Sequence, residues 1–276
     1  MNMRKEKDIG SWLLIALAAL FLLILLVLPL VLVVHEALAR GIRVYLAAIS
    51  DPFAIKALLL TLMATVIAVA LNTLFGLASA WLLTKYDFHG KALIGALIDL
   101  PFAISPVVAG LFFVVLFGRM SPLFPLLREA HVQVLFAVPA VVLATVFVTF
   151  PFITRELVPV MESQGRSEEE AAATLGASGW QTFWHVTLPN IRWALLYGVI
   201  LAAARAMGEF GAVSVVSGHI RGRTNTLPLH IEILYNEYNF TAAFAVASLL
   251  VVMAVVLLAA RNVVEWQAKR GMHHGD

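Results

Sequence analysis

The feature that most constrains this chain is a series of long stretches with almost no charged residues. The first of them, Ser11–Val34, contains 24 residues, and none is charged. A helix needs about 20 apolar residues to cross the hydrocarbon core of a bilayer, so this stretch is long enough to span one. Five further stretches have the same character, which predicts six membrane-spanning helices. The predicted spans are 11–34, 57–84, 92–118, 132–154, 193–218 and 240–260.

The composition agrees with a protein embedded in a membrane. Apolar residues make up 61% of the chain, charged residues only 13%, and the mean hydropathy is +0.91. A soluble fold of this size could not keep so much hydrocarbon away from water. We therefore predict an all-α membrane protein that forms one domain over residues 1–276 and lies in contact with lipid.

Several kinds of chemistry find no support in the sequence. The chain has no cysteine, which excludes disulfides and thiolate metal sites, and its histidines are not at metal-binding spacings. It has no paired carboxylates or nucleophile–base set of the kind an enzyme needs, and no glycine-rich phosphate loop. We expect no metal, no cofactor and no nucleic-acid partner. Any ATP that drives this protein must be bound by another chain.

The first apolar stretch has an alternative interpretation as a cleaved secretory signal, with Ala37-Leu38-Ala39 as the small-residue cleavage site. The apolar core of a signal peptide is roughly 7 to 15 residues long. Because Ser11–Val34 is longer than that, we interpret it as a span.

The positions of the basic residues predict the orientation, because cytoplasmic segments are enriched in lysine and arginine. With the N-terminus inside the cell, eleven basic residues lie in cytoplasmic segments and seven lie outside. The cytoplasmic set is Arg4, Lys5, Lys7, Lys85, Lys91, Arg155, Arg166, Arg192, Arg261, Lys269 and Arg270, and the outer set is Arg40, Arg43, Lys56, Arg119, Arg128, Arg221 and Arg223. Both termini and the loop 165–190 are therefore predicted to be cytoplasmic.

The loop 165–190 is a polar, amphipathic interruption between two spans. Ser167 and Glu170 have the spacing of a capping box at a helix start, and Gly176 suits the left-handed turn that ends a helix. Ser178 could cap a second short helix that ends at Pro189. The apolar stripe of that second helix would consist of Trp180, Phe183, Trp184 and Val186. Two helices around a glycine hinge predict a docking surface outside the membrane.

Arg205 and Glu209 are ionisable residues inside the fifth predicted span. They are four residues apart, so on a helix they share a face and can pair. A charge at the centre of a bilayer costs at least about 2.5 kcal/mol, which makes both residues functional candidates. Two interpretations stay open: the pair locks the helix bundle, or Arg205 faces a hydrated path for an anion while Glu209 holds it. Gly208 and Gly211 suit close packing beside such a path.

Asp99 is the only charged residue in the third predicted span. It could join the network of Arg205 and Glu209 or lie near the membrane interface. Pro101 and Pro106 each remove a helix amide, so this span should be kinked or broken. Broken helices often line transport paths.

The outer segment 217–239 has the pattern of a short helix at the outer surface, because apolar residues alternate there with His230, Glu232 and other polar ones. Arg221 and Arg223 could attract an anion or dock a partner. The alternative is a solvated loop in which they have no partner.

The loop 165–190 resembles the EAA loop of the membrane subunits of bacterial ABC importers. The shared pattern is Glu170-Ala171-Ala172, three residues, Gly176, nine residues, Val186, one residue and Leu188-Pro189, with valine where the family has isoleucine. The resemblance covers essentially the whole chain. It implies that Glu170, Ala171, Ala172, Gly176, Leu188 and Pro189 couple the permease to separate ABC ATPase subunits.

A second segment narrows the resemblance. Residues 205–212, RAMGEFGA, are similar to the RALGEFGA segment of molybdate/sulfate permeases, with Met207 in place of leucine. Residues 214–229 look most like the CysW-type subunits of sulfate/thiosulfate importers. This implies a permease subunit in a bacterial inner membrane, a second homologous permease and a periplasmic sulfate-binding protein. The alternatives are a molybdate or tungstate permease and an anion channel or secondary transporter that needs no ATP.

Overall fold

The computed structural model describes residues 9–272, and every regular element in that range is helical. The helices are α1 (Ile9–Leu22), α2 (Leu28–Leu38), α3 (Ile42–Ile49), α4 (Pro52–Lys85), α5 (Lys91–Ala103), α6 (Pro106–Phe117), α7 (Phe124–Glu129), α8 (Val138–Gln164), α9 (Ser167–Thr174), α10 (Gly179–Thr182), α11 (Leu188–Met207), α12 (Gly211–Ser217), α13 (Leu227–Asn236) and α14 (Phe240–Met272). The all-α prediction is confirmed. Arg4, Lys5 and Lys7 of the predicted cytoplasmic set lie outside the described residues.

The described part of the chain contains five helical stretches that are long and apolar enough to cross a membrane. They are Gly10–Leu38, Pro52–Lys85, Val138–Gln164, Gly179–Met207 and Phe240–Gln267. A sixth span results if α5 and α6, which meet at an angle of 110°, count as one broken span. The six predicted spans thus correspond to five helices and one bent pair.

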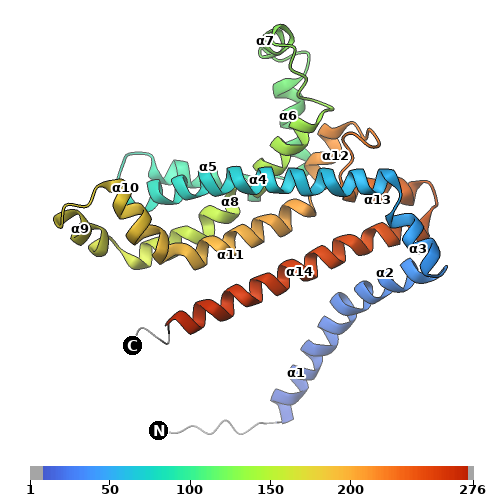
Figure 1. Cartoon of the computed structure of the whole chain (residues 1–276), viewed down its shortest axis with the longest axis horizontal. Coiled ribbons are helices and arrows are strands. Elements are labelled where there is room, and N and C mark those ends of the chain that lie inside the picture. The colour runs from blue at the N-terminus through green and yellow to red at the C-terminus, as the bar shows by residue number, and fades with distance from the viewer. Residues whose placement is uncertain (1–8, 273–276) are drawn as a thin grey trace.

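The centre of the molecule is formed by α4, α8 and α11, which lie side by side (Figure 1). Glycines let them approach closely: a Cβ at Gly76 of α4 would lie 3.0 Å from Ile153 of α8, and one at Gly198 of α11 would lie 3.2 Å from the same residue. Asn72 of α4 also donates a 2.8 Å hydrogen bond to Oγ1 of Thr149 on α8. Small residues and interhelical hydrogen bonds hold helices together in lipid, where no hydrophobic effect drives association.

The third predicted span is broken, as its prolines indicate. Ile104 and Ser105 are extended, and Pro106 begins α6 in a new direction. Proline disfavours the helical conformation in the residue before it, which accounts for the break at this position. Pro101, in contrast, stays inside α5. α6 and α7 therefore extend away from the bundle (Figure 1).

The fifth predicted span, 193–218, is wrong as a continuous helix. α11 ends at Met207, and the chain resumes as α12 only at Gly211. Hydropathy alone does not show whether a helix continues through an apolar stretch that contains glycines. The helix also begins before residue 193, because α10 continues through a π-helical turn, Phe183–Thr187, into α11.

The broken parts of the two spans pack against each other. A Cβ at Gly110 of α6 would lie 2.8 Å from the carbonyl oxygen of Ala212, and one at Gly211 would lie 2.9 Å from Pro106. Only glycine allows these approaches. The two breaks, which are about a hundred residues apart in the sequence, therefore lie next to each other in the fold.

The N-terminal helix stands apart from the bundle. None of the residues in the apolar window of Gly10–Leu38 is buried, and its contact with the rest of the chain is mainly that of α2 with α14. Figure 1 shows α1 diverging from α14. An apolar helix that is exposed over most of its surface must be covered by lipid or by another protein.

α3 and α13 lie at the end of the bundle opposite α9 and α10 (Figure 1). α13 confirms the short helix predicted within 217–239. This segment is folded against the bundle: Leu227 and Leu229 are buried, and the N–H of Leu227 donates a 2.7 Å hydrogen bond to Oγ1 of Thr61 on α4. The segment is therefore not a solvated loop throughout, although Arg221 and Arg223 lie in the turns before α13.

Candidate functional site

The loop between α8 and α11 consists of the two short helices that the sequence predicts. Gly165 (φ +69°) ends α8, and Gly176 (φ +89°) separates α9 from α10. Both backbone conformations favour glycine. Ser178 caps α10, because its Oγ accepts from the N–H of Gln181 while the side chain of Gln181 accepts from the N–H of Ser178.

The predicted capping box of Ser167 and Glu170 is wrong. Arg166 is the N-cap residue of α9, no side chain caps the helix, and Ser167 is already its first residue. α9 starts one residue earlier than the box requires, so Ser167 is its first residue and Glu170 its fourth, and they no longer occupy the N-cap and third helical positions. Three glutamates in this turn still interact favourably with the positive end of the helix dipole.

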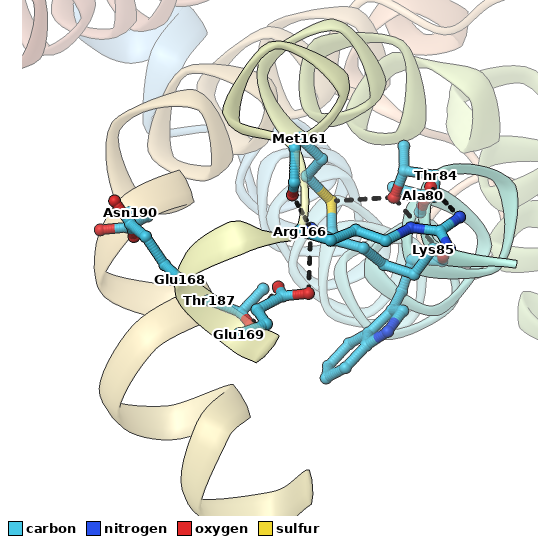
Figure 2. A network of polar contacts seen from close by, with 11 residues as sticks. Ala80, Thr84, Lys85, Met161, Arg166, Glu168, Glu169, Thr187 and Asn190 are labelled. Carbon is cyan, nitrogen blue, oxygen red and sulfur yellow. Dashed lines mark hydrogen bonds and ion pairs between the residues drawn. The ribbon is translucent and has the colours of Figure 1, made fainter. Parts of the chain in front are cut away.

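The three successive glutamates of α9 have three different environments, and Figure 2 shows those of Glu168 and Glu169. Glu168 accepts a short hydrogen bond from Nδ2 of Asn190 on α11. Glu169 accepts a 2.7 Å hydrogen bond from Oγ1 of Thr187 and lies 3.1 Å from Nζ of Lys85. Glu170 is exposed, and its carboxylate has no hydrogen bond or ion pair to the described residues. Of these three glutamates, only Glu170 has no partner among the described residues.

The other predicted coupling residues lie close to Glu170 or anchor the loop. Ala171 and Gly176 are exposed, and Ala172 is half-buried. Leu188 packs into the core of α4, α8 and α11. Pro189 does not end the second helix as predicted, because it lies in the first turn of α11, where the preceding π-helical turn accommodates a residue without an N–H.

The aromatic side chains of α10 and the π-helical turn form a cluster against α4. The ring centroid of Phe183 lies 5.0 Å from that of Trp81, and Trp180 and Trp184 pack against Phe183. They border an apolar cavity of about 710 Å³ between α4, α10 and α11. The predicted apolar stripe thus rests on the spanning helices, while Trp180 and Trp184 remain exposed.

Arg205 and Glu209 do form an ion pair, with Nη1 2.7 Å from Oε2. They do not share a continuous helix, because Gly208 ends α11 and Glu209 lies in the break. The other carboxylate oxygen, Oε1, accepts a 2.8 Å hydrogen bond from the N–H of Ala212 at the start of α12. The Glu209 side chain is 1% exposed, whereas that of Arg205 is 32% exposed. Glu209 thus joins α11 to α12, and Arg205 reaches the surface of the chain.

Asp99 is not part of this network. Its Oδ1 accepts a 2.8 Å hydrogen bond from Nε of Arg155 on α8, and the guanidinium of Arg155 also lies 4.8 Å from the ring centre of Phe102. Both charged side chains are about half-exposed in this chain. From the sequence, Arg155 was predicted only to be one of the basic residues of the cytoplasmic segments. Its position one residue beyond the predicted fourth span was the signal that it could reach Asp99.

The two docking candidates of the outer segment differ. Arg221 lies 2.5 Å from the Glu237 carboxylate and beside His230, whose pKa is lowered by burial and then by the charge of Arg221. These side chains border a cavity of about 390 Å³. Arg223 is exposed, and no hydrogen bond or ion pair joins its side chain to the described residues. No group of metal-ligating side chains occurs within the described range.

A family model for binding-protein-dependent transport system inner membrane components matches residues 72–270. The sulfate transport system permease protein CysW of Escherichia coli (strain K12) is 50% identical to this chain over 94% of it and 89% of the relative. CysT, a sulfate transport system permease protein of the same organism, is 36% identical over 93% of this chain and 92% of the relative.

Solved structures agree on the fold. A chain of a bacterial alginate ABC transporter, crystallised in complex with an alginate pentasaccharide-bound periplasmic protein, matches with a TM-score of 0.75. The match covers 97% of this chain and 98% of that chain at 18% identity. At this identity the likeness concerns the fold alone.

Proposed function

The chain belongs to the family of binding-protein-dependent transport system inner membrane components, and we propose that it is the permease subunit of an ATP-driven importer of sulfate, with thiosulfate as a second substrate. Relatives named as sulfate transport permeases support the substrate. The observation that carries the proposal is the loop between α8 and α11, where the exposed Glu170 and Gly176 occur at the spacing of an EAA loop. The permease itself performs no chemistry.

Separate ABC ATPase subunits supply the energy in this proposal. The chain has no phosphate loop of its own, while α9 and α10 offer an exposed surface at one end of the bundle. We propose that this end is cytoplasmic, together with both termini. Closure of the ATPases on ATP moves α9 and α10, and the attached α8 and α11 switch the path between outward- and inward-facing.

Two further partners complete the importer. A second, homologous permease covers the apolar α1–α2 helix, and the resemblance to both CysW and CysT supports a heterodimer. A periplasmic sulfate-binding protein docks at the opposite end of the bundle. There Arg223 is the stronger docking candidate, because Arg221 is already bound to Glu237.

The translocation path follows the adjacent breaks of the two broken spans. Polar groups at membrane depth are tolerated where they line a hydrated cavity, and Arg205 reaches the surface there. Glu209 holds the arginine, and Gly208 and Gly211 allow the backbone of the break to approach α6. Asp99 and Arg155 form a second charged pair, which we place at the inner part of the path.

Arg205→Ala is predicted to reduce sulfate uptake per assembled complex by about tenfold. The reason is that the anion loses a positive charge on its path. The double variant Arg205→Ala with Glu209→Gln serves as the control, because it also removes the unpaired carboxylate. Equal losses of assembled complex and uptake in both variants would assign the pair to packing alone.

The test of the function is uptake of radioactive sulfate into proteoliposomes that contain the complex purified through a tag on this chain. We expect uptake that requires ATP and the binding protein and that excess thiosulfate inhibits. Uptake without ATP would identify a channel or secondary transporter. Competition by molybdate or tungstate but not by thiosulfate would identify the other oxyanion permease.

A further inference from the structure

Lys85, the last residue of α4, contacts the loop between α8 and α11 although no covalent connection joins α4 to it. Its ammonium Nζ donates a 2.7 Å hydrogen bond to the carbonyl oxygen of Gly165, which ends α8, and lies 3.1 Å from the Glu169 carboxylate on α9 (Figure 2). The side chain of Lys85 is only 8% exposed and that of Glu169 is 19% exposed. The pair is therefore largely shielded from water.

Glu169 joins this pair to α11. Its second carboxylate oxygen accepts a 2.7 Å hydrogen bond from Thr187, whose own side chain is buried at the start of α11. One carboxylate thus bridges the end of α4 to the start of α11. Charge-assisted hydrogen bonds are stronger than neutral ones, and shielding from water strengthens them further.

The other ion pairs near Lys85 are more exposed to solvent than the pair of Lys85 and Glu169. Lys91 lies 3.3 Å from Asp87, but these side chains are 37% and 80% exposed. Arg166 lies 3.5 Å from the same aspartate, again largely in solvent. Exposed pairs of this kind contribute little. Of these ion pairs, the one between Lys85 and Glu169 is therefore expected to contribute most to holding the loop against α4.

We propose that Lys85 and Glu169 form a latch that fastens α9 to α4, so that α4 moves with the loop together with α8 and α11. α4 packs against α8 more extensively than any other pair of helices in the described chain. A displacement of α9 is consequently transmitted along the core of the bundle and not only to the helices that the loop connects. Lys85 and Glu169 are positioning residues in this proposal. Their effect on uptake rests on the proposed function, but the latch itself does not.

The experiment measures the distance between α9 and α4. The chain has no cysteine, so Leu82→Cys and Ala173→Cys, both at exposed positions, can carry spin labels without background labelling. Pulsed electron–electron double resonance on the complex, with and without ATP, gives the distribution of distances between the two spin labels. We expect one narrow distribution that ATP does not shift, because the two helices move together.

Three variants test the latch in the same labelled protein. Lys85→Met should broaden the distribution at least about twofold, since local contacts set how far a segment opens. The double variant Lys85→Met with Glu169→Met removes the unpaired carboxylate as well, and its distance distribution should also be broad. Lys91→Met, the same substitution at an exposed pair, should leave the distribution narrow. A narrow distribution in either latch variant would overturn the proposal.

Uptake provides the second measurement. Lys85→Met should lower the sulfate imported per ATP hydrolysed by about tenfold, within the range of coupling energies between sites, whereas Lys85→Arg should retain most of it. Unchanged coupling in Lys85→Met would overturn the transmitting role. If the wild-type complex imports no sulfate, the proposed function fails, while the distance measurement still decides whether the latch exists.

Discussion

Glu209→Ala should destabilise the folded chain by about 3 kcal/mol or more, because it breaks a buried ion pair and leaves one charge without its partner. Glu209 is the charged side chain with the least exposure among those described, and it holds both Arg205 and the N–H of Ala212. Its loss leaves an arginine unpaired at membrane depth and the start of α12 without an acceptor. The measurement is the thermal stability of the purified complex in detergent.

A matched control for Glu209→Ala is Glu237→Ala. Glu237 also pairs with an arginine, Arg221, but its side chain is 53% exposed, so its loss should cost less than about 1 kcal/mol. The double variant Arg205→Ala with Glu209→Ala should recover part of the stability, because the unpaired charge is gone. Similar stability of Glu209→Ala and Glu237→Ala would contradict the role of Glu209 in holding the break.

Glu170→Lys is expected to abolish ATP-driven uptake while the permease still folds. Glu170 has no partner within the described chain, so reversing its charge costs the fold little. Reversing a charge at an interface weakens docking by about 2 kcal/mol or more, which is a roughly 30-fold weaker association. The measurement is the amount of ATP-binding chain that co-purifies with the permease, together with uptake.

The control for Glu170→Lys is Glu129→Lys, the same charge reversal at an exposed residue of α7. It should leave co-purification unchanged. Gly176→Val is the companion variant, because a β-branched residue at a φ of +89° strains the turn that sets α10 relative to α9. Normal uptake in both Glu170→Lys and Gly176→Val would refute the coupling assignment.

The family and much of the loop could be predicted from the sequence. The spacing from Glu170 to Pro189 identified an ABC importer permease, which the family model confirms. Gly176 and Ser178 have the conformations predicted for them, because a left-handed turn and an N-cap depend on a few neighbouring residues. The capping box of Ser167 and Glu170 failed because α9 starts one residue earlier, with Arg166 as its N-cap, which places Ser167 inside the helix.

The pairing of charges was predicted less well. Arg205 and Glu209 were expected to meet on a helix, and they do meet, although across a break in it. Asp99 was given no definite partner, and it pairs with Arg155, which is 56 residues away in the sequence. Long-range pairs of this kind depend on how helices pack, and one sequence contains no direct record of packing.

The amino-acid sequence by itself determined that this chain is a helical membrane protein with several apolar spans and a polar loop between two of them. Hydropathy and helix length are local properties, and the thickness of a bilayer turns them into spans. Only the tertiary structure decided which of three adjacent glutamates is available to a partner. Successive residues of a helix point in different directions, about 100° apart, so the helices packed around α9 determine their environments. Lys85 of α4 and Asn190 of α11 bind two of them, and Glu170 remains exposed.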